Sequence, residues 1–390
     1  MNLSDSTPGR ASYAYLPALD GFRAVSILLV FLSHAGLEHI IPGGLGVLTF
    51  FVLSGFLITR QIIAEIEKTG TLSVKRFYLR RVLRLVPPLL AYILVFSVVL
   101  GLLGATITTT HIFSGLFYFA NYYQIFVGYT QHNPLPILWS LSVEEHFYTL
   151  FPLVILLFRN HLKKILPWLG ATVIVVLIWR TYLSNLCNTA GSVLCGLSGQ
   201  ERIFHGTDTI FDSILYGAIA ALALHYYNHS IRRWLINPAS FGLAIACLFG
   251  TLLYRDPFFR ETLRLSLQAI SVAIIMINVL FSAFSGVERL RRFLSLGPCL
   301  LLGRMSYSLY LFHFGVLNAV YALQGTENTI EGAGGMALYV GGSLPCAALS
   351  YYLIEQPMLG LRRRFGAHAV DSSRGVPSMG MGFSLAGGKR

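Results

Sequence analysis

The chain has 390 residues, of which 55% are hydrophobic and only 12% are charged. Soluble domains carry charge at roughly a quarter of their positions, so this composition excludes an ordinary soluble globular protein. The formal net charge of +12 would suit a nucleic-acid-binding protein. However, the basic residues lie in short segments between apolar stretches, so we expect them to orient the chain in a membrane and expect no nucleic-acid partner.

Apolar stretches recur along the whole chain, and about 20 such residues suffice for a helix to cross a hydrocarbon core of roughly 30 Å. The predicted fold class is therefore all-α, a polytopic integral membrane protein with about ten transmembrane helices. We expect a cytoplasmic leader at 1–15, a membrane domain at 16–360 and a basic, disordered cytoplasmic tail at 361–390. The predicted spans are 16–37, 46–66, 85–104, 138–158, 165–183, 208–227, 238–254, 265–285, 300–323 and 335–355.

A further apolar piece at 112–127 decides the topology. The segment between the second and third spans is rich in Lys and Arg, which predicts that it is cytoplasmic and that the N-terminus lies inside. If 112–127 crossed, the chain would have eleven spans and the later basic segments near 159–164, 232–233 and 289–292 would lie outside. We therefore expect 112–127 to be re-entrant or interfacial, with aromatic and amide residues that suit a pocket lining, and both termini to be cytoplasmic.

The same topology places the 184–207 loop outside, and this loop contains Cys187 and Cys195. An oxidising compartment permits a disulfide between them. Two unpaired thiols remain the alternative, and the sequence leaves both open.

Ionisable residues inside membrane spans are costly and are therefore functional candidates. Arg23 and His34 lie in the first predicted span, eleven residues apart. That spacing puts them on one helix face, about 16 Å apart along the axis, with Arg23 toward the cytoplasm and His34 in the outer half. The alternative is an Arg that extends to the interface and a hydrogen-bonded core His.

A basic cluster at the start of the third span contains Arg80, Arg81 and Arg84. Guanidinium groups offer a planar fork to phosphate oxygens, so the cluster suits a phosphorylated ligand. Arginines that set topology beside anionic lipid headgroups would look the same.

Later spans carry further polar groups. Glu144 and Glu145, followed by His146, open the span at 138–158 on the predicted outer face, where solvated helix caps are the alternative explanation. The others are Asp208 and Asp212 with His205 nearby, Arg304, Tyr307 and His313 in one group, and Glu355 at the inner surface.

These groups favour acyl transfer. Histidine is the side chain best suited to proton transfer near neutral pH, and we expect His34 to pair with Glu144 or Glu145. Such a base, with arginines that hold a phosphorylated donor, fits transfer from a coenzyme A thioester to a hydroxyl. The sequence has no P-loop, GxSxG, HExxH or paired CxxC motif, so we expect no metal.

The chain resembles the acyltransferase family 3 membrane proteins over about residues 15–360. Arg23 and His34 match the family's Arg/Lys-x10-His pattern, and Arg81 and Arg84 match its Arg-x-x-Arg pattern. Its other signatures resemble the segments FFVLSGFLIT, WSLSVEEHFY, FDSILYGAIAA, SYSLYLFHFG and YLIEQP.

The resemblance implies an enzyme that O-acylates polysaccharides, lipopolysaccharide sugars, Nod factors or macrolides. It implies that His34 is catalytic, that Glu145 is a site carboxylate and that three arginines serve the donor. The candidate residues are therefore His34, Glu145 and Glu144 for catalysis, Arg23, Arg81 and Arg84 for the donor acetyl-CoA, and Asp212, Tyr307 and His313 for substrate.

Two departures from the family pattern stand out. Leu48 occupies a position at which members often have Asp, which affects the expected acceptor geometry. The sequence also has no hydrolase-like C-terminal domain, so we expect transfer to be completed within the membrane domain.

The leading hypothesis is a bacterial inner-membrane O-acyltransferase that transfers acetyl from acetyl-CoA to a hydroxyl of a cell-surface or exported polysaccharide. His34 would act as the base or as a transient acyl carrier. The alternative is a transporter or flippase for a lipid-linked glycan, with the same polar groups lining a passage. A third hypothesis is a structural membrane partner of a glycan-synthesis complex.

Overall fold

The computed structural model describes residues 15–159, 161–189 and 192–363, and all regular elements in these ranges are helical. The predicted all-α class is confirmed. The α-helices are α1 (Pro17–Leu32), α2 (Gly43–Thr69), α3 (Val74–Leu102), α4 (Thr109–Leu116), α5 (Ala120–Phe126), α6 (Trp139–Leu157), α7 (Ile165–Thr189), α8 (Gly199–His205), α9 (Thr207–Ile210), α10 (Asp212–Tyr226), α11 (Asn228–Leu235), α12 (Pro238–Leu253), α13 (Pro257–Glu261), α14 (Leu263–Phe281), α15 (Ser285–Leu294), α16 (Gly297–Arg304), α17 (Ser306–Gln324), α18 (Gly332–Ser350) and α19 (Gln356–Arg363). The 3-10 and π-helical turns are η2 (Ser33–Leu37), η3 (Leu135–Leu138), η4 (Leu162–Lys164), η5 (Val193–Cys195) and η6 (Tyr351–Glu355).

Seven segments of the described chain are long and apolar enough to cross a membrane, and two bent helix pairs raise the number to at most nine. The bent pairs are α11 with α12 and α16 with α17, each bent by 66°. The predicted span at 208–227 is divided between α9 and α10, and α10 has 15 residues, fewer than the roughly 20 that a straight crossing requires. The membrane class is therefore confirmed, whereas the number ten is not.

The apolar piece at 112–127 forms parts of α4 and α5, which have 8 and 7 residues. Thr108 caps α4, and Tyr118 has a positive φ of 56° where the chain turns between the two helices. Neither helix is long enough to cross a membrane, which confirms the prediction that this piece does not span.

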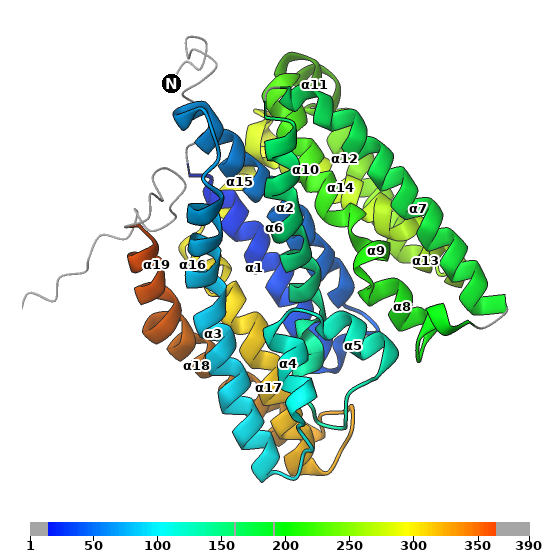
Figure 1. Cartoon of the computed structure of the whole chain (residues 1–390), viewed down its shortest axis with the longest axis vertical. Coiled ribbons are helices and arrows are strands. Elements are labelled where there is room, and N and C mark those ends of the chain that lie inside the picture. The colour runs from blue at the N-terminus through cyan, green and yellow to red at the C-terminus, as the bar shows by residue number, and fades with distance from the viewer. Residues whose placement is uncertain (1–14, 160, 190–191, 364–390) are drawn as a thin grey trace, which may run out of the picture.

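The long helices pack in one bundle. In Figure 1, α1, α2 and α6 lie in the middle, with α7, α12 and α14 to one side and α3, α17 and α18 to the other. One very close approach joins α2 to α10. A Cβ at Gly55 would lie 1.9 Å from the Ile214 carbonyl oxygen, and a Cβ at Gly217 would lie 2.0 Å from that of Val52. Small residues let membrane helices approach this closely, and here they fix the wall behind the candidate site.

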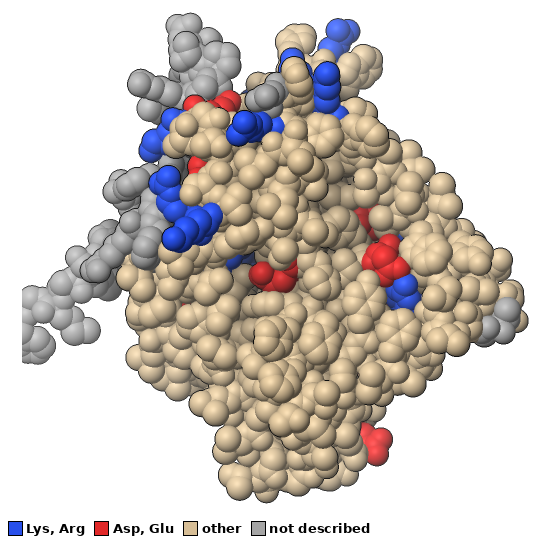
Figure 2. All heavy atoms as spheres, in the orientation of Figure 1, with Lys and Arg blue, Asp and Glu red and all other residues tan. Residues whose placement is uncertain are grey.

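Basic residues gather at one end of the bundle, called the basic end below. It comprises the α2–α3 turn, α11 and α15, with Lys68, Lys75, Arg76, Arg232, Arg233, Arg289, Arg291 and Arg292. Figure 2 shows this concentration of Lys and Arg at the end where α11 and α15 lie in Figure 1. Arg260 lies in α13 and Arg255 just before it, and α13 lies away from the basic end (Figure 1). The predicted leader lies outside the described residues except for Tyr15, and the predicted tail does so except for 361–363, which end α19.

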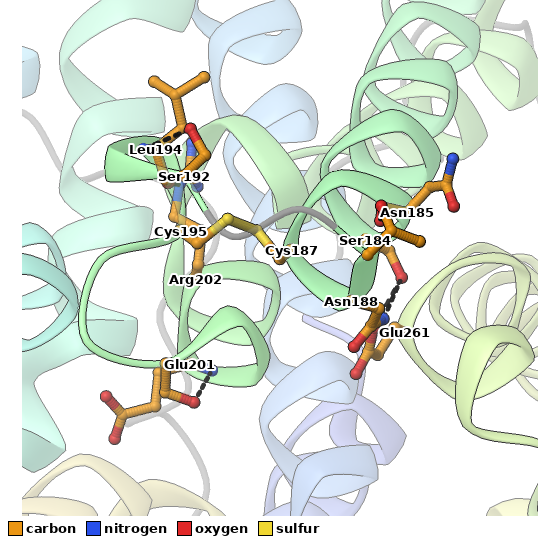
Figure 3. Close-up of a disulfide and its surroundings, with 12 residues drawn as sticks. Ser184, Asn185, Cys187, Asn188, Ser192, Leu194, Cys195, Glu201, Arg202 and Glu261 are labelled. Atoms are coloured by element: carbon orange, nitrogen blue, oxygen red, sulfur yellow. Dashed lines mark hydrogen bonds between the residues drawn. A yellow bond between two sulfur atoms is a disulfide. The ribbon is translucent and has the colours of Figure 1, made fainter.

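A disulfide joins Cys187, near the end of α7, to Cys195 in η5 (Figure 3). This end of α7, next to α8, lies opposite to the basic end (Figure 1). Glu261 of α13 lies beside the same part of α7 and accepts hydrogen bonds from Ser184 at 2.6 Å and Asn188 at 3.0 Å. Of the two alternatives that the sequence left open, the structure therefore has the disulfide. It closes a short loop that leads directly into α8.

Removal of this disulfide should destabilise the protein. Replacing both Cys187 and Cys195 with Ser is expected to lower the free energy of unfolding by about 2–3 kcal/mol. The reason is that the disulfide restricts the unfolded chain, and a short closed loop reduces the entropy of the unfolded state by about that amount. The measurement is thermal unfolding in detergent with and without reductant. Cys247→Ser, at a free cysteine, is the matched control. A wild-type melting temperature that does not respond to complete reduction would contradict the expectation.

Candidate active site

Three arginines predicted for donor binding meet in one cavity. Arg23 of α1 and Arg81 and Arg84 of α3 line a space of about 560 Å³. The Arg81 guanidinium carbon lies 3.6 Å from the centroid of the Tyr148 ring, a cation–π contact. The Nε atoms of Arg81 and Arg84 are buried and have no hydrogen-bond partner in the described part of the chain. Buried guanidinium groups with unused donors favour an anionic ligand.

Glu144 lines the same cavity. It accepts hydrogen bonds from Ser54 at 2.8 Å and from Tyr148 at 3.2 Å. The Glu144 side chain therefore lies with Arg81 and Arg84, not at the outer face that the sequence predicted. It lies deeper because η3 and the first turn of α6 come before it in the chain. Glu145, the next residue, has one buried carboxylate oxygen with no hydrogen-bond partner among the described residues.

A second cavity of about 770 Å³ adjoins the first toward the basic end and shares Arg23 and Arg84 with it. Asp20 accepts a 2.6 Å hydrogen bond from Tyr15, and its carboxylate lies 3.7 Å from Arg304. Burial raises the pKa of Tyr15 to about 12, so this hydroxyl remains protonated and can donate. Arg60 and Glu355 also line the cavity, which therefore has a basic wall with two acidic members.

The catalytic candidate His34 lines a third cavity of about 700 Å³, toward the opposite end. It lies in η2, where the π-helical turn ends the first span and Gly36 has a φ of 86°. Val47 and Tyr310 line both this cavity and the arginine cavity. The three cavities thus adjoin one another in a row from the basic end to His34.

The hydrogen-bond partner of His34 is His313 of α17, with 3.1 Å between His34 Nδ1 and His313 Nε2. His313 Nδ1 lies 2.8 Å from the carbonyl oxygen of Leu309. A carbonyl oxygen can only accept, so a neutral His313 carries its proton on Nδ1 and presents the lone pair of Nε2 to His34. His34 Nδ1 therefore donates, and the lone pair of His34 lies on Nε2, available for reaction.

The structure separates two groups that the sequence analysis expected together. His34 pairs with His313, and Glu144 pairs with Ser54 and Tyr148, so the expected histidine–carboxylate pair does not form here. Two binding candidates do lie beside the row of cavities. Tyr307 lines the arginine cavity and donates a 2.7 Å hydrogen bond to Leu85, while His313 contacts His34 directly.

Asp212 lies elsewhere. It forms a fully buried ion pair with Arg180 of α7, at 2.9 Å, and accepts a 2.6 Å hydrogen bond from Ser266 of α14. Its contacts join three helices and leave it out of the lining of the three cavities. Leu48, which departs from the family pattern noted in the sequence analysis, is buried in the hydrophobic core.

Sequence reasoning did not assign three other residues of the His34 cavity, Gln124, Trp139 and His205. Gln124 lies in the segment 112–127, whose residues the sequence analysis found suited to a pocket lining, and its side chain does line this cavity. Trp139 carried no comparable signal, because a lone aromatic residue near a helix start is usually a membrane anchor. The sequence analysis named His205 only for its nearness to Asp208 and Asp212. No group of three His, Cys, Asp or Glu residues within the described ranges is arranged to hold a metal ion.

The structure is that of a polytopic helical membrane protein in which arginines and a histidine line a row of internal cavities. Comparison with known proteins decides which family this is. The acyltransferase domain family matches residues 16–355, and the chain belongs to that family. The recognition made from sequence motifs is thereby confirmed.

Two relatives illustrate the relationship. The chain is 31% identical over 329 residues to the O-acetyltransferase OatA of Staphylococcus aureus (strain NCTC 8325 / PS 47), which covers 80% of this chain and 52% of that protein. It is 27% identical over 386 residues to a protein of Staphylococcus aureus (strain COL) provisionally named an O-acetyltransferase, covering 92% of this chain and 59% of that protein. The chain therefore spans only about half to three fifths of the length of these two curated relatives. No solved structure matches it significantly.

Proposed function

We propose that this chain is a bacterial inner-membrane O-acetyltransferase that moves acetyl from acetyl-CoA to a hydroxyl of a cell-surface or exported polysaccharide. The observation that carries the proposal is the row of three cavities between the arginine cluster and His34. Such a row lets a donor and an acceptor approach one histidine from opposite sides of a membrane.

The arginine side suits the donor. Coenzyme A carries several phosphate groups. Arg81 and Arg84 each have a buried Nε donor without a partner among the described residues, and Arg23 lines the same cavity. Arg23 and His34 lie about 16 Å apart along one helix axis. An extended pantetheine arm spans a comparable length, so phosphates held at the arginines place the thioester near His34.

Charge and redox chemistry support one orientation. Basic segments favour the cytoplasm, which contains acetyl-CoA, so we assign the basic end and both termini to that side. The Cys187–Cys195 disulfide at the other end suits an oxidising exterior. The acceptor then enters at the His34 cavity.

In the proposed reaction His34 Nε2 takes the proton of the acceptor hydroxyl as the oxygen attacks the thioester carbonyl. The new C–O bond forms, the C–S bond breaks, and the proton passes from Nε2 to the departing thiolate. His313 is a positioning residue that fixes the reactive tautomer of His34. A path with acetyl carried transiently on Nε2 uses the same lone pair. Glu144 and Glu145 lie on the side of the arginine cavity, where Glu144 helps to position the side chains next to Arg81.

The test uses purified wild-type protein with acetyl-CoA and follows release of free thiol. An acetyltransferase releases thiol by transfer or slow hydrolysis, whereas a flippase that merely passes a glycan does not. We expect Arg81→Gln and Arg84→Gln each to raise the KM for acetyl-CoA roughly tenfold to a hundredfold, since a hydrogen bond from a charged group contributes about 1.5–3 kcal/mol.

Arg76→Gln, at an exposed arginine near the start of the same helix, is the matched control and should leave that KM unchanged. Equal effects of all three substitutions would indicate general surface charge rather than a donor site. Failure of the wild type to release thiol would favour the transporter hypothesis.

A further inference from the structure

The cavity beside His34 has an aromatic wall that the proposed chemistry does not use. Trp139 and His205 both line it, with ring centroids 4.5 Å apart and planes inclined by 39°. Trp139 begins α6 and His205 ends α8, so residues distant in the sequence form this wall. The two rings offer an aromatic surface in the same cavity that His34 lines.

Two polar atoms beside this wall have unused hydrogen-bonding capacity. His205 Nδ1 and the Gln124 side-chain oxygen are buried and have no hydrogen-bond partner among the residues that the structure describes. Burial of a polar atom without a partner costs about 1–3 kcal/mol. A ligand that supplied hydroxyl groups would recover that cost.

The elements that carry these side chains are held together by side chains and backbone. Asn121 of α5 donates to the carbonyl oxygen of His205 at 3.2 Å, and Gln124 lies one turn further along α5. Arg202 of α8 makes a paired contact with Asp208, at 2.9 and 2.5 Å. The disulfide fastens the segment immediately before α8, as Figure 3 shows. These contacts hold the His205 and Gln124 segments together without a ligand.

We propose that Trp139, His205 and Gln124 form the acceptor subsite and bind one sugar ring of the polysaccharide. This inference rests on the proposed function and assigns it a substrate-binding site. The C–H face of a pyranose packs against the aromatic wall, while ring hydroxyls bond to His205 Nδ1 and the Gln124 amide. Apolar walls with a few placed polar groups are typical of small-ligand sites. A lipid alcohol has a single hydroxyl, which the reaction at His34 uses, so both polar atoms would stay unpaired. The geometry therefore favours a saccharide.

The experiment compares transfer with hydrolysis in one preparation. Membrane vesicles from a deletion strain that carries each full-length variant receive acetyl-CoA labelled on the acetyl group. Label is then measured in the polysaccharide fraction, in the lipid fraction and as free acetate. We expect Trp139→Ala and His205→Ala to lower the ratio of polysaccharide label to free acetate on the order of tenfold, which corresponds to about 1.4 kcal/mol. Trp139→Phe, which retains an aromatic face, should restore most of the ratio.

Trp168→Ala is the matched control, since Trp168 of α7 is 64% exposed on the side of the bundle, and its ratio should equal that of the wild type. An unchanged ratio in both Trp139→Ala and His205→Ala, even with lower total activity, would overturn the subsite. Label that enters lipid in place of polysaccharide would overturn the saccharide assignment. A wild type that labels no fraction and hydrolyses no acetyl-CoA would instead overturn the proposed function.

Discussion

Alanine in place of His34 is expected to lower the kcat for acetyl transfer by about 10²–10⁴-fold, the usual contribution of a positioned general base. The reason is geometric: His34 Nδ1 is used by His313, so its Nε2 carries the free lone pair next to the cavity. The measurement is transfer of labelled acetyl by purified protein. His39→Ala is the matched control, because His39 lies five residues further along and its side chain is 90% exposed.

His313 provides the second arm of this experiment. His313→Leu removes the acceptor for His34 Nδ1 and is expected to lower kcat roughly 10–100-fold with little change in the KM for acetyl-CoA, as loss of a supporting hydrogen bond does at other histidine sites. His313→Gln retains an acceptor oxygen and should recover part of the rate. Full activity in His34→Ala would exclude both the base and the acyl-carrier mechanism.

The His34–His313 contact also shows where sequence reasoning stops. Arg23 and His34 could be placed on one face because helical periodicity is local. His313 is 279 residues away from His34 in the chain, and nothing in its own segment indicates which helix faces it. The sequence therefore offers Glu144 or Glu145 as the partner of His34 on depth alone. Depth follows from position within a span, but the identity of a neighbour follows from packing.

The count of spans was limited by a related difficulty. Hydropathy finds an apolar stretch, yet it does not show where a helix is interrupted. The chain has a one-residue interruption at Phe211 between α9 and α10, and it bends near Met305 between α16 and α17. By contrast, the short piece at 112–127 was resolved correctly, because the basic residues of every later loop bear on whether it crosses. Cumulative signals along a chain are more reliable than single ones.

Asp212 leads to the second large effect. Asp212→Ala is expected to lower the free energy of unfolding by about 3–5 kcal/mol, since it leaves the Arg180 guanidinium buried without its counter-charge. Both side chains are fully buried, and Arg180 also donates to Ser266 and to the carbonyl oxygen of Thr209, each at 2.6 Å. The pair thereby ties α7 to α10 and α14. Thermal unfolding in detergent, followed by circular dichroism, measures the loss.

The sequence analysis assigned Asp212 to substrate binding, and the same variants separate that role from a structural one. Replacing Arg180 and Asp212 together with Leu removes both charges, so much of the stability lost in Asp212→Ala should return. If Asp212 serves only the structure, activity per folded molecule returns with it. If Asp212 contacts substrate, the double variant is stable but its KM for acceptor stays high. The ion pair is buried on all sides and lies apart from the three cavities, so we expect stability and activity to recover together.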